Sequence, residues 1–532
     1  MRISVGKASI GRPVLAFAAA TLMCTPFSAH AASPAVGMPE RSAVRILDQA
    51  TWGPTATAIN DLRTSGFDAW FNKQLTAPLS PIPDQPLLGT DGKAYTTVGP
   101  LQANFYANTL NGRDQLRQRV AFALSEIWVV SNLDLDRAAA FPPILRIFQT
   151  DAFANYETLM KHVTLNPAMG HYLDMANNDK GNPTKNTAAN ENYARELMQL
   201  FTIGLYELNN DGSSVIKNGV PVPSYTQDTV TNLAKMFTGW TYAPLAGAAD
   251  HTHNPINFMS PMEAHDLDHD TTAKTVLGVV VPAGTTAMED VDKALSIIFA
   301  QPGLPPFISK QLIQHLVTSN PSPGYVRRVS AVFENDGRGV RGDMKAVIYA
   351  ILTDEEARAG DTQPFTSAPD FGHYREPVLF LANLLRGLNA TLSATSNVEA
   401  YTNSLGQNLF NSPSVFSYFP PDYQTGGLTA PELNIYNTQT SVSRTGVVNT
   451  AVFGAHLDAN TTFNLTPFIT AASTTGQSQF FSLVNTLFFH DEMSNEVHTA
   501  MQKAMAAVAV PADKARAGLY IALTSNEYQV IH

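Results

Sequence analysis

The sequence predicts a mainly α fold, a single large multi-helix domain with long loops and at most a small β-hairpin. Apolar residues recur at intervals of three and four in many segments, which is the period of an amphipathic helix. Strand-like runs are few, and no linker-like stretch interrupts the chain between about Pro39 and His532. Hydrophobic residues make up 44% of the chain and charged residues only 15%, against roughly 25% charged in ordinary globular domains, so a large core can be buried.

Residues 1–31 predict a secretory signal peptide. Basic residues precede a short apolar run, Val14–Thr25, and Ala29 and Ala31 place small residues before a cleavage site after Ala31. The apolar run is too short to remain as a membrane anchor, because a spanning helix needs about 20 residues. We therefore expect an exported protein, periplasmic or extracellular, whose remaining chain forms one helical domain over residues 39–532.

The composition of the exported chain limits its chemistry and its partners. Cys24, the only cysteine, lies in the signal peptide, so neither a disulfide nor thiolate chemistry is expected. Loss of the signal peptide removes three cations and no acids, which changes the formal net charge from −11 to −14. This acidic balance argues against nucleic acid or an anionic membrane as the main partner.

Helical stripes occur, in chain order, in Arg113–Ser131, Asp151–Leu165, Glu191–Leu205, Gln227–Trp240, Val291–Ala300, Phe307–Val317, Gly342–Leu352, Tyr374–Leu388 and Asp513–Leu523. In the first, Leu116 and Val120 begin an apolar stripe with helical spacing. Thr226 is a typical N-cap before the fourth segment, and Gly204 and Gly239 each follow the end of a stripe, as C-terminal glycines do.

Between the helical segments, Thr275–Gly284 is the best strand signal and predicts a small hairpin. The longest polar loop includes Pro244–Thr275, and a loop of that length inside a domain is usually functional or disordered. Residues 385–415 and 455–478 are rich in Asn, Thr and Ser, and we expect surface loops there.

The segment NENYARELMQLFTIG, Asn190–Gly204, has a polar start and an apolar end. Helical spacing places Glu191 and Arg195 on one stripe and Glu196 on the neighbouring one. Two carboxylates on one helical wall, with an arginine that keeps one of them ionised, could divide the acid and base roles of catalysis. The alternative is helix-terminus electrostatics, in which Glu191–Arg195 is an ordinary ion pair worth a few tenths of a kcal/mol.

A second candidate site is rich in histidine. His251, His253, His265 and His269 fall within nineteen residues, accompanied by several acids. Imidazole and carboxylate ligands together suit a divalent transition metal, although the spacing matches no closed structural site. The alternative is a solvated acidic loop.

Common catalytic signatures are absent from the sequence. We find no G-x-S-x-G elbow, no S-x-x-K with its partners, no H-E-x-x-H and no phosphate-binding P-loop. This disfavours the common serine hydrolases, zinc proteases of that type and nucleotide-dependent enzymes.

Several segments together resemble the large bacterial family called domain of unknown function 1800, over nearly the whole exported chain. They are Arg45–Thr55, Phe67–Leu75, Asn190–Gly204, Tyr225–Trp240, His269–Gly278, Gly342–Glu356, Tyr374–Leu388, and PSVFSYFPPDY (Pro413–Tyr423) leading to APELNI. The resemblance implies a mostly helical, exported protein. Because members are often encoded beside an alkaline-phosphatase-like family, it also implies such a protein as a partner.

The resemblance also separates the candidate residues that lie in family motifs from those that do not. Glu191, Arg195, Glu196, Asp228, Trp240, His269, Asp270 and Lys274 fall inside family motifs, whereas the other three histidines of the cluster do not. Many members have a histidine pair in the segment that here reads FALSEIWVVS, Phe122–Ser131, which contains no histidine. A metal role is therefore less expected in this chain than in such members.

These observations favour an exported hydrolase or lyase that acts on a cell-surface or extracellular polymer. We expect Glu191 and Glu196 to be acid/base groups, Arg195 to orient them and Asp228 to be a nearby second acid. In the same hypothesis Lys274 and Trp240 bind substrate, and His269 and Asp270 bind a divalent metal or transfer a proton. The alternative is a non-catalytic helical scaffold that partners the phosphatase-like protein. In that case these residues form a buried polar network that fixes how the helices pack.

Overall fold

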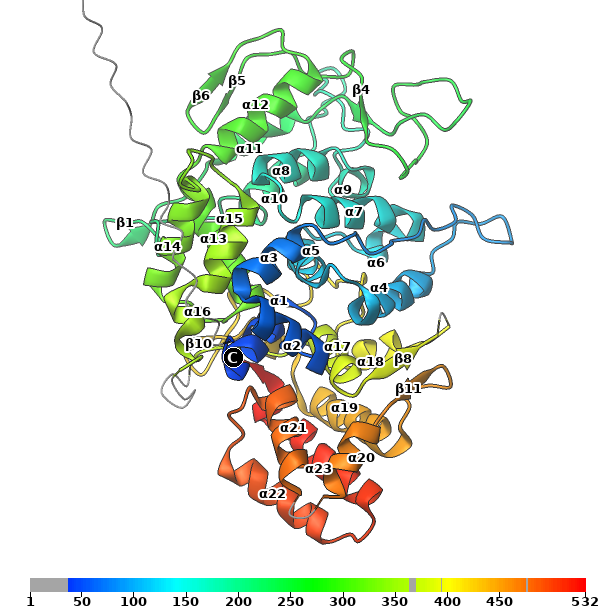
Figure 1. Ribbon diagram of the computed structural model, residues 1–532. Coiled ribbons are helices and arrows are strands. Elements are labelled where there is room, and N and C mark those ends of the chain that lie inside the picture. Colours follow the sequence, from blue (N-terminus) through cyan, green and yellow to red (C-terminus); the bar gives the residue numbers. More distant parts are fainter. Residues whose placement is uncertain (1–36, 363–369, 394, 475–476) are drawn as a thin grey trace, which may run out of the picture. The chain divides into compact units, whose positions relative to one another are not determined.

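Helices dominate the computed structural model, which describes residues 37–362, 370–393, 395–474 and 477–532 (Figure 1). The predicted signal peptide, residues 1–31, lies outside the described residues. Residues Met38–His532 form one compact unit. The predicted mainly α, single-domain fold is thus confirmed.

The α-helices of the first half are α1 (Glu40–Ala50), α2 (Ala56–Ser65), α3 (Phe67–Leu75), α4 (Gly99–Asn111), α5 (Gln115–Ile127), α6 (Asn132–Leu135), α7 (Phe141–Asp151), α8 (Tyr156–Thr164), α9 (Pro167–Tyr172), α10 (Asn192–Gln199) and α11 (Gln227–Met236). Those of the second half are α12 (Ala287–Phe299), α13 (Leu304–Leu316), α14 (Pro323–Glu334), α15 (Met344–Thr353), α16 (Glu355–Ala359), α17 (Pro377–Gly387), α18 (Glu399–Ser404), α19 (Thr438–Asn449), α20 (Thr466–Ala472), α21 (Ser478–Phe489), α22 (Asn495–Ala506) and α23 (Pro511–Thr524). Short 3₁₀ or π turns are η1 (Ala138–Ala140), η3 (Pro431–Ile435), η4 (Thr450–Gly454) and η6 (Glu527–Gln529).

Strands in the described part of the chain form short antiparallel pairs. They are β1 (Ile216–Lys217) with β2 (Val220–Pro221), β3 (Trp240–Thr241) with β4 (Glu263–Ala264), β5 (Lys274–Val276) with β6 (Val279–Val281), β7 (His373–Tyr374) with β12 (Val530–Ile531), β8 (Ala390–Leu392) with β11 (Thr461–Phe463), and β9 (Gln424–Thr425) with β10 (Leu428–Thr429). The predicted hairpin is β5–β6, with Lys274 opposite Val281. The other pairs were not predicted, because two or three residues are too few to produce an alternating pattern.

The nine predicted helical segments correspond to α5, α8, α10, α11, α12, α13, α15, α17 and α23. Thr226 caps α11 as predicted, since its hydroxyl accepts a hydrogen bond from the Thr229 N–H. Gly204 and Gly239 have φ values of +73° and +77°, as expected for glycines that end helices. The prediction of a surface loop over 385–415 was wrong in part, because this polar segment contains α18 and the buried Gln407.

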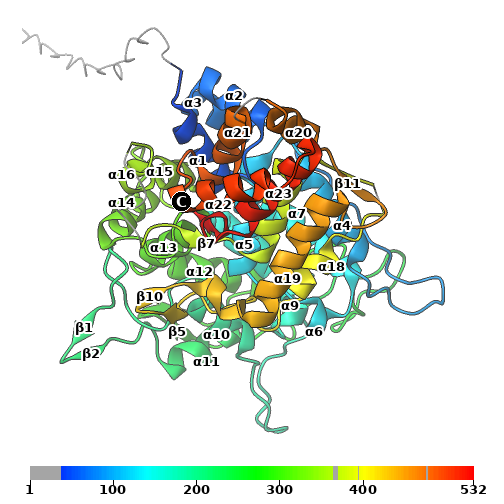
Figure 2. The same ribbon diagram turned by 90° about the horizontal axis from the view of Figure 1, so that it is seen from below.

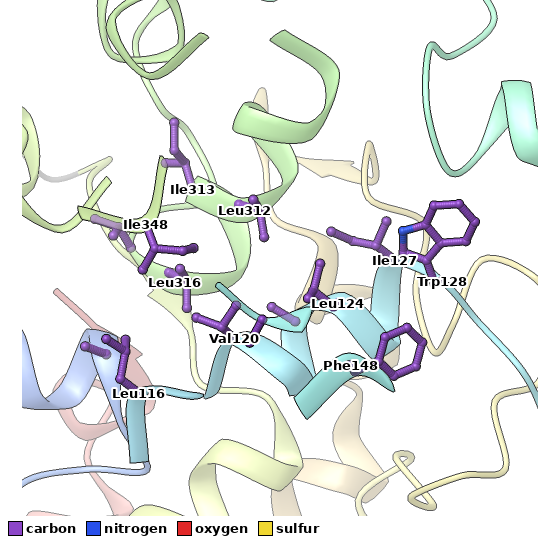
Figure 3. Close-up of a cluster of buried hydrophobic side chains, with 14 of the residues drawn as sticks. Leu116, Val120, Leu124, Ile127, Trp128, Phe148, Leu312, Ile313, Leu316 and Ile348 are labelled. Atoms are coloured by element: carbon purple, nitrogen blue, oxygen red, sulfur yellow. The ribbon is translucent and has the colours of Figure 1, made fainter. Parts of the chain in front are cut away.

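The hydrophobic core is built around α5, which packs against α13 (Figure 3). Val120 and Leu124 from α5 face Leu312 and Leu316 from α13, and all four side chains are fully buried. Because α5 lies inside the core, any polar side chain on it must be paired or used.

The two ends of the described unit pack together. Helix α1 contacts α21 near the C-terminus (Figure 2), and β12 pairs with β7 in the middle of the sequence. Helices α19 to α23 gather around one another. Among the described residues, none of the helices combines the length and apolar character that crossing a membrane requires.

Candidate functional site

The predicted ion pair at the start of α10 is present. Arg195 Nη2 lies 3.0 Å from Glu191 Oε2, and Gln227 and Thr231 of α11 also donate hydrogen bonds to the Glu191 carboxylate. Partial burial raises the pKa of Glu191, but these hydrogen bonds and the Arg195 charge outweigh it and hold the pKa below its usual value. Glu191 and Arg195 therefore join α10 to α11 at a partly exposed surface.

The other two predicted acids differ in environment. Asp228, in the first turn of α11, is exposed. Glu196 is half-buried, burial raises its pKa, and its buried Oε2 has no hydrogen-bond partner among the described residues. Leu200, one turn after Glu196, lines a cavity that Glu126 also lines.

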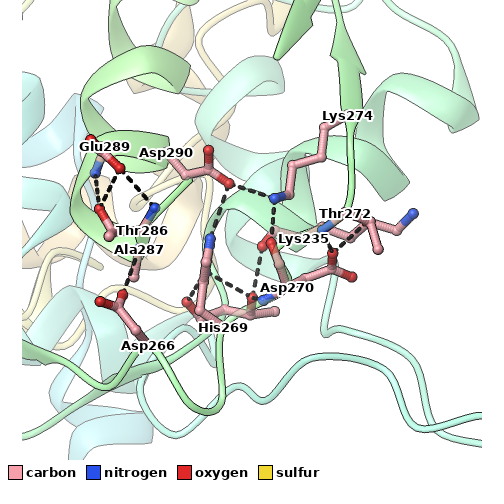
Figure 4. Close-up of polar contacts among 11 residues, drawn as sticks. Lys235, Asp266, His269, Asp270, Thr272, Lys274, Thr286, Ala287, Glu289 and Asp290 are labelled. Atoms are coloured by element: carbon pink, nitrogen blue, oxygen red, sulfur yellow. Dashed lines mark hydrogen bonds and ion pairs between the residues drawn. The ribbon is translucent and has the colours of Figure 1, made fainter. Parts of the chain in front are cut away.

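His269 lies in a fully buried polar cluster (Figure 4). Its Nδ1 lies 2.9 Å from the carbonyl oxygen of Thr238, and its Nε2 lies 3.1 Å from Asp290 Oδ2. Lys274 Nζ lies 2.7 Å from the same Asp290 oxygen and also donates to the carbonyl of Asp270. Sequence reasoning did not identify Asp290, which belongs to α12.

The remaining predicted binding residues are also enclosed. Lys274 and Trp240 are each 1% exposed, and the Asp270 carboxylate accepts hydrogen bonds from Thr272. Both ring nitrogens of His269 face protein oxygens, so neither is directed at Asp270. The substrate and metal roles assigned to these residues stay predictions.

The predicted residues form two groups, one at each end of α11. The Glu191 carboxylate contacts Gln227 at the start of this helix, whereas His269 contacts Thr238 just after its end. Ten helical residues rise by about 15 Å, which separates the two groups. The other histidines do not converge either: His253 pairs with Asp179 and His265 with Asp250. Among the described residues, no three His, Cys, Asp or Glu side chains are grouped as metal ligands.

A different set of acids meets inside the core. Glu126 near the end of α5 and Glu376 just before α17 are both buried, and their carboxyl groups interact electrostatically. Gln407 Nε2 bridges them, 3.1 Å from Glu126 Oε1 and 2.6 Å from Glu376 Oε2. The amide oxygen of Gln407 accepts a hydrogen bond from the Val378 N–H, which fixes the orientation of the bridge. We call Glu126 and Glu376 the carboxyl pair.

The carboxyl pair binds protons unusually tightly. Burial raises the pKa of each glutamate to about 8, and the negative charge of Glu126 contributes to the rise at Glu376. The Arg119 guanidinium, two turns before Glu126 on α5, opposes this rise. Because the two sites are coupled, the pair holds at least one proton near neutral pH.

Further polar groups surround the pair. His315 Nδ1 on α13 lies 3.4 Å from Glu126 Oε2, and burial lowers the pKa of His315. Arg119 is fully buried and donates to the His315 carbonyl. A third buried acid, Glu432 of η3, lies 3.3 Å from His373 Nδ1.

A cavity of about 40 Å³ adjoins these groups, which we call the polar cavity. Glu126, His315, Glu432, Gln311 and Ser417 line it. The Gln311 Nε2 is buried and has no hydrogen-bond partner in the described segments, so it can donate to a bound molecule. Ser417 has a φ of +61°, a conformation uncommon for a residue other than glycine.

The carboxyl pair was not predicted from the sequence, although both glutamates lie in segments that were compared with the family. Glu126 falls within FALSEIWVVS, Glu376 within YREPVLFLANLLRGL and Glu432 within APELNI. The available signal was Glu126, an acid placed within a strongly apolar helix. No pattern in the sequence linked it to Glu376, which lies 250 residues later.

Comparison with known proteins gives one match. The family model described as "Protein of unknown function (DUF1800)" matches residues 45–530. No curated protein and no solved structure matches the chain. The family model covers nearly the whole of the described helical unit, so the chain belongs to the DUF1800 family, as its motifs predicted.

Proposed function

We propose that the protein is an acid/base enzyme, a hydrolase or a lyase, and that the carboxyl pair Glu126 and Glu376 supplies the acid and the base. One observation carries the proposal: two buried carboxyl groups share the Gln407 amide, burial raises the pKa of each to about 8, and one of them, Glu126, lines a cavity. Carboxyl groups with raised pKa values in a cleft are typical of catalytic acids.

The geometry favours hydrolysis over elimination. Two neighbouring carboxyl groups can act together on a substrate and a water molecule, with one group ionised and the other protonated. The carboxylate removes a proton from the water as it attacks, and the carboxylic acid donates a proton to the leaving atom.

The surrounding groups position and tune the pair. Gln407 donates to both carboxyls and so keeps them at a fixed distance from each other. Arg119 favours ionisation of one of the two, and the unpartnered Gln311 Nε2 can orient a substrate oxygen in the polar cavity.

The sequence supports a proposal for the compartment and for the class of substrate. The signal peptide predicted over residues 1–31 supports export to the periplasm or beyond. An exported enzyme without cysteines or a nucleotide-binding motif suits a cell-surface or extracellular polymer as substrate.

Replacement of Glu126 by Gln tests the proposal. We expect Glu126→Gln to keep the fold, because glutamine resembles the protonated acid, and to lower turnover of chromogenic ester, amide and glycoside substrates at least 100-fold. The matched control is Glu157→Gln, which changes a half-buried acid with a raised pKa outside the polar cavity. Full activity in Glu126→Gln would remove the carboxyl pair from the mechanism.

An infrared spectrum of the protein at pH 7 supplies a test that needs no substrate. We expect the carbonyl band of a protonated carboxyl group, and expect Glu126→Gln to weaken it. Equal bands in the two proteins would mean that Glu126 does not hold the proton of the pair at this pH.

A non-catalytic scaffold that partners an exported phosphatase-like protein is the second candidate. The observation that favours it is the cluster of His269, Lys274 and Asp290, whose side chains are completely enclosed. Such a cluster specifies helix packing. Normal function of the Glu126→Gln variant in the cell, together with its co-purification with the phosphatase-like protein, would support this candidate.

A further inference from the structure

A second, apolar cavity lies beside the carboxyl pair. We call it the phenylalanine cavity, because Phe105, Phe122, Phe148 and Phe410 line it. Its volume is about 70 Å³, and half-buried residues such as Leu145 lie along its edge. The four phenylalanines come from α4, α5, α7 and the segment after α18.

A third cavity of about 30 Å³, which we call the connecting cavity, lies between the phenylalanine cavity and the polar cavity, because it shares lining residues with both. It shares Phe122, Phe148 and Phe410 with the phenylalanine cavity, and shares Glu126 and Ser417 with the polar cavity. Glu126 therefore lines both the connecting cavity and the polar cavity.

The backbone at this junction supports a binding role. Phe410 and Ser417 have φ values of +68° and +61°. Residues other than glycine that are held in this region cost about 1–3 kcal/mol and are concentrated at binding and active sites. Both residues line the connecting cavity.

From this arrangement we propose that the substrate is a short-chain acyl ester or acyl amide of a polar molecule. The acyl chain lies in the phenylalanine cavity, the carbonyl oxygen accepts a hydrogen bond from Gln311, and the polar molecule occupies the polar cavity. A dry cavity of 150 Å³ holds benzene, so about 70 Å³ holds a chain of roughly three carbon atoms beyond the carbonyl. The inference rests on the proposed acid/base function.

The reaction is hydrolysis. The water oxygen bonds to the acyl carbon while the bond from that carbon to the ester oxygen or amide nitrogen breaks. The ionised member of the carboxyl pair takes the proton of the water, and the protonated member gives its proton to the leaving oxygen or nitrogen. The products are a short carboxylic acid and an alcohol or amine.

Binding of neutral amides tests the cavity without any turnover. Acetamide, butyramide and octanamide are titrated into the full chain and followed by ligand-observed NMR. Each buried methylene strengthens binding about fourfold, so we expect butyramide, which has two more methylenes, to bind about 15-fold more tightly than acetamide. Octanamide should bind no better than butyramide, because the cavity is full. Equal affinity for acetamide and butyramide would overturn the proposal.

Substitutions of residues that line the phenylalanine cavity make the test more specific. Ala121→Phe places a ring in the phenylalanine cavity, and we expect it to reduce butyramide binding to the acetamide level. The control is Ala506→Phe on the exposed side of α22. Should Ala121→Phe fail to fold, Leu145→Ala enlarges the cavity and should shift the preference from butyramide towards octanamide. If the folded variants bind the three amides in the same order of affinity as the unaltered chain, the acyl chain does not lie in the phenylalanine cavity.

Two further measurements separate this inference from the proposed function. Glu126→Gln should bind butyramide within threefold of the unaltered chain yet lose hydrolysis of nitrophenyl butyrate and butyryl nitroanilide. Chain-length-selective binding without any hydrolysis would retain the acyl site and refute the enzyme. Hydrolysis without chain-length selectivity would retain the enzyme and refute the acyl site. The faster of the two chromogenic substrates identifies the linkage as ester or amide.

Discussion

At the scale of single residues, the surroundings of each glutamate determine its chemistry. Glu191 is partly exposed, receives hydrogen bonds from α11 and pairs with Arg195, so its pKa falls. Glu126 and Glu376 are buried together, so their pKa values rise. Sequence reasoning selected Glu191 because its ion pair is visible in helical spacing, whereas the environment of Glu126 depends on contacts that spacing does not encode.

The raised pKa values make a prediction about stability. Between about pH 4.5, the usual glutamate value, and about pH 8, Glu376 binds more protons in the folded chain than in the unfolded chain, so its contribution to stability falls as the pH rises. Glu376→Gln removes this group. We expect the variant to reduce the slope of unfolding free energy against pH by up to roughly 1.4 kcal/mol per pH unit. Denaturant unfolding from pH 5 to 8 measures this slope. Parallel curves for the variant and the unaltered chain would refute the raised pKa of Glu376.

At the scale of elements, α11 organises both groups of predicted residues. Its capped start contacts Glu191, and the turn after its end holds His269. Periodicity and caps predicted this helix and its ends correctly, because both signals are local. The separation of the two groups could not be predicted, since it depends on which neighbours pack against each end.

Gly239, after α11, supplies a prediction with an internal control. Its φ is +77°, and an added Cβ would lie 2.8 Å from the His265 carbonyl oxygen and 2.9 Å from His269 Cβ. Gly278, in the β5–β6 turn, has a φ of +80° but open space around the added Cβ. We expect Gly278→Ala to cost about 1 kcal/mol from backbone strain alone, and Gly239→Ala to cost clearly more. Equal losses of unfolding free energy would exclude the predicted clash.

The buried cluster at α12 gives a second prediction at this scale. Lys274→Met leaves the Asp290 carboxylate without its nearest charge, and we expect a loss of about 3–5 kcal/mol of unfolding free energy. Lys274→Met combined with Asp290→Asn should lose less, because no unpaired charge remains. Arg195→Ala, which breaks a partly exposed pair, should cost at most about 1 kcal/mol. If Lys274→Met instead abolished activity at unchanged stability, the predicted substrate contact of Lys274 would be supported.

At the scale of the whole molecule, the carboxyl pair is assembled from segments that are distant in the sequence. Glu126 is held by the core packing of α5 on α13, whereas Glu376 follows β7, whose pairing partner β12 lies near residue 530. The sequence therefore predicted the helices that support the site but not the site itself. Long-range packing brings its residues together, and local periodicity carries no record of that packing.

A buried charged cluster at Asp48 links α1 to the segment before α17 and to the segment after α21. Asp48 of α1 binds Arg375 through two contacts of 2.8 and 2.9 Å, and it also contacts His490 at 2.8 Å. Burial alone would raise the pKa of Asp48, but the charge of Arg375 and the His490 hydrogen bond hold it well below its usual range. Its contribution to stability is therefore complete above about pH 4 and is lost as the pH falls further.

Because Asp48 links three distant segments, we expect Asp48→Asn to destabilise the described unit as a whole. The variant leaves the buried Arg375 guanidinium without its carboxylate, which costs about 3–5 kcal/mol. Asp61→Asn, which removes an exposed partner of Lys73, is the control and should cost no more than about 1 kcal/mol. Tryptophan fluorescence and far-ultraviolet circular dichroism should report the same shifted transition, since the helices of both ends depend on one centre. Two separate transitions would show that the ends unfold independently and that Asp48 stabilises only its own neighbourhood.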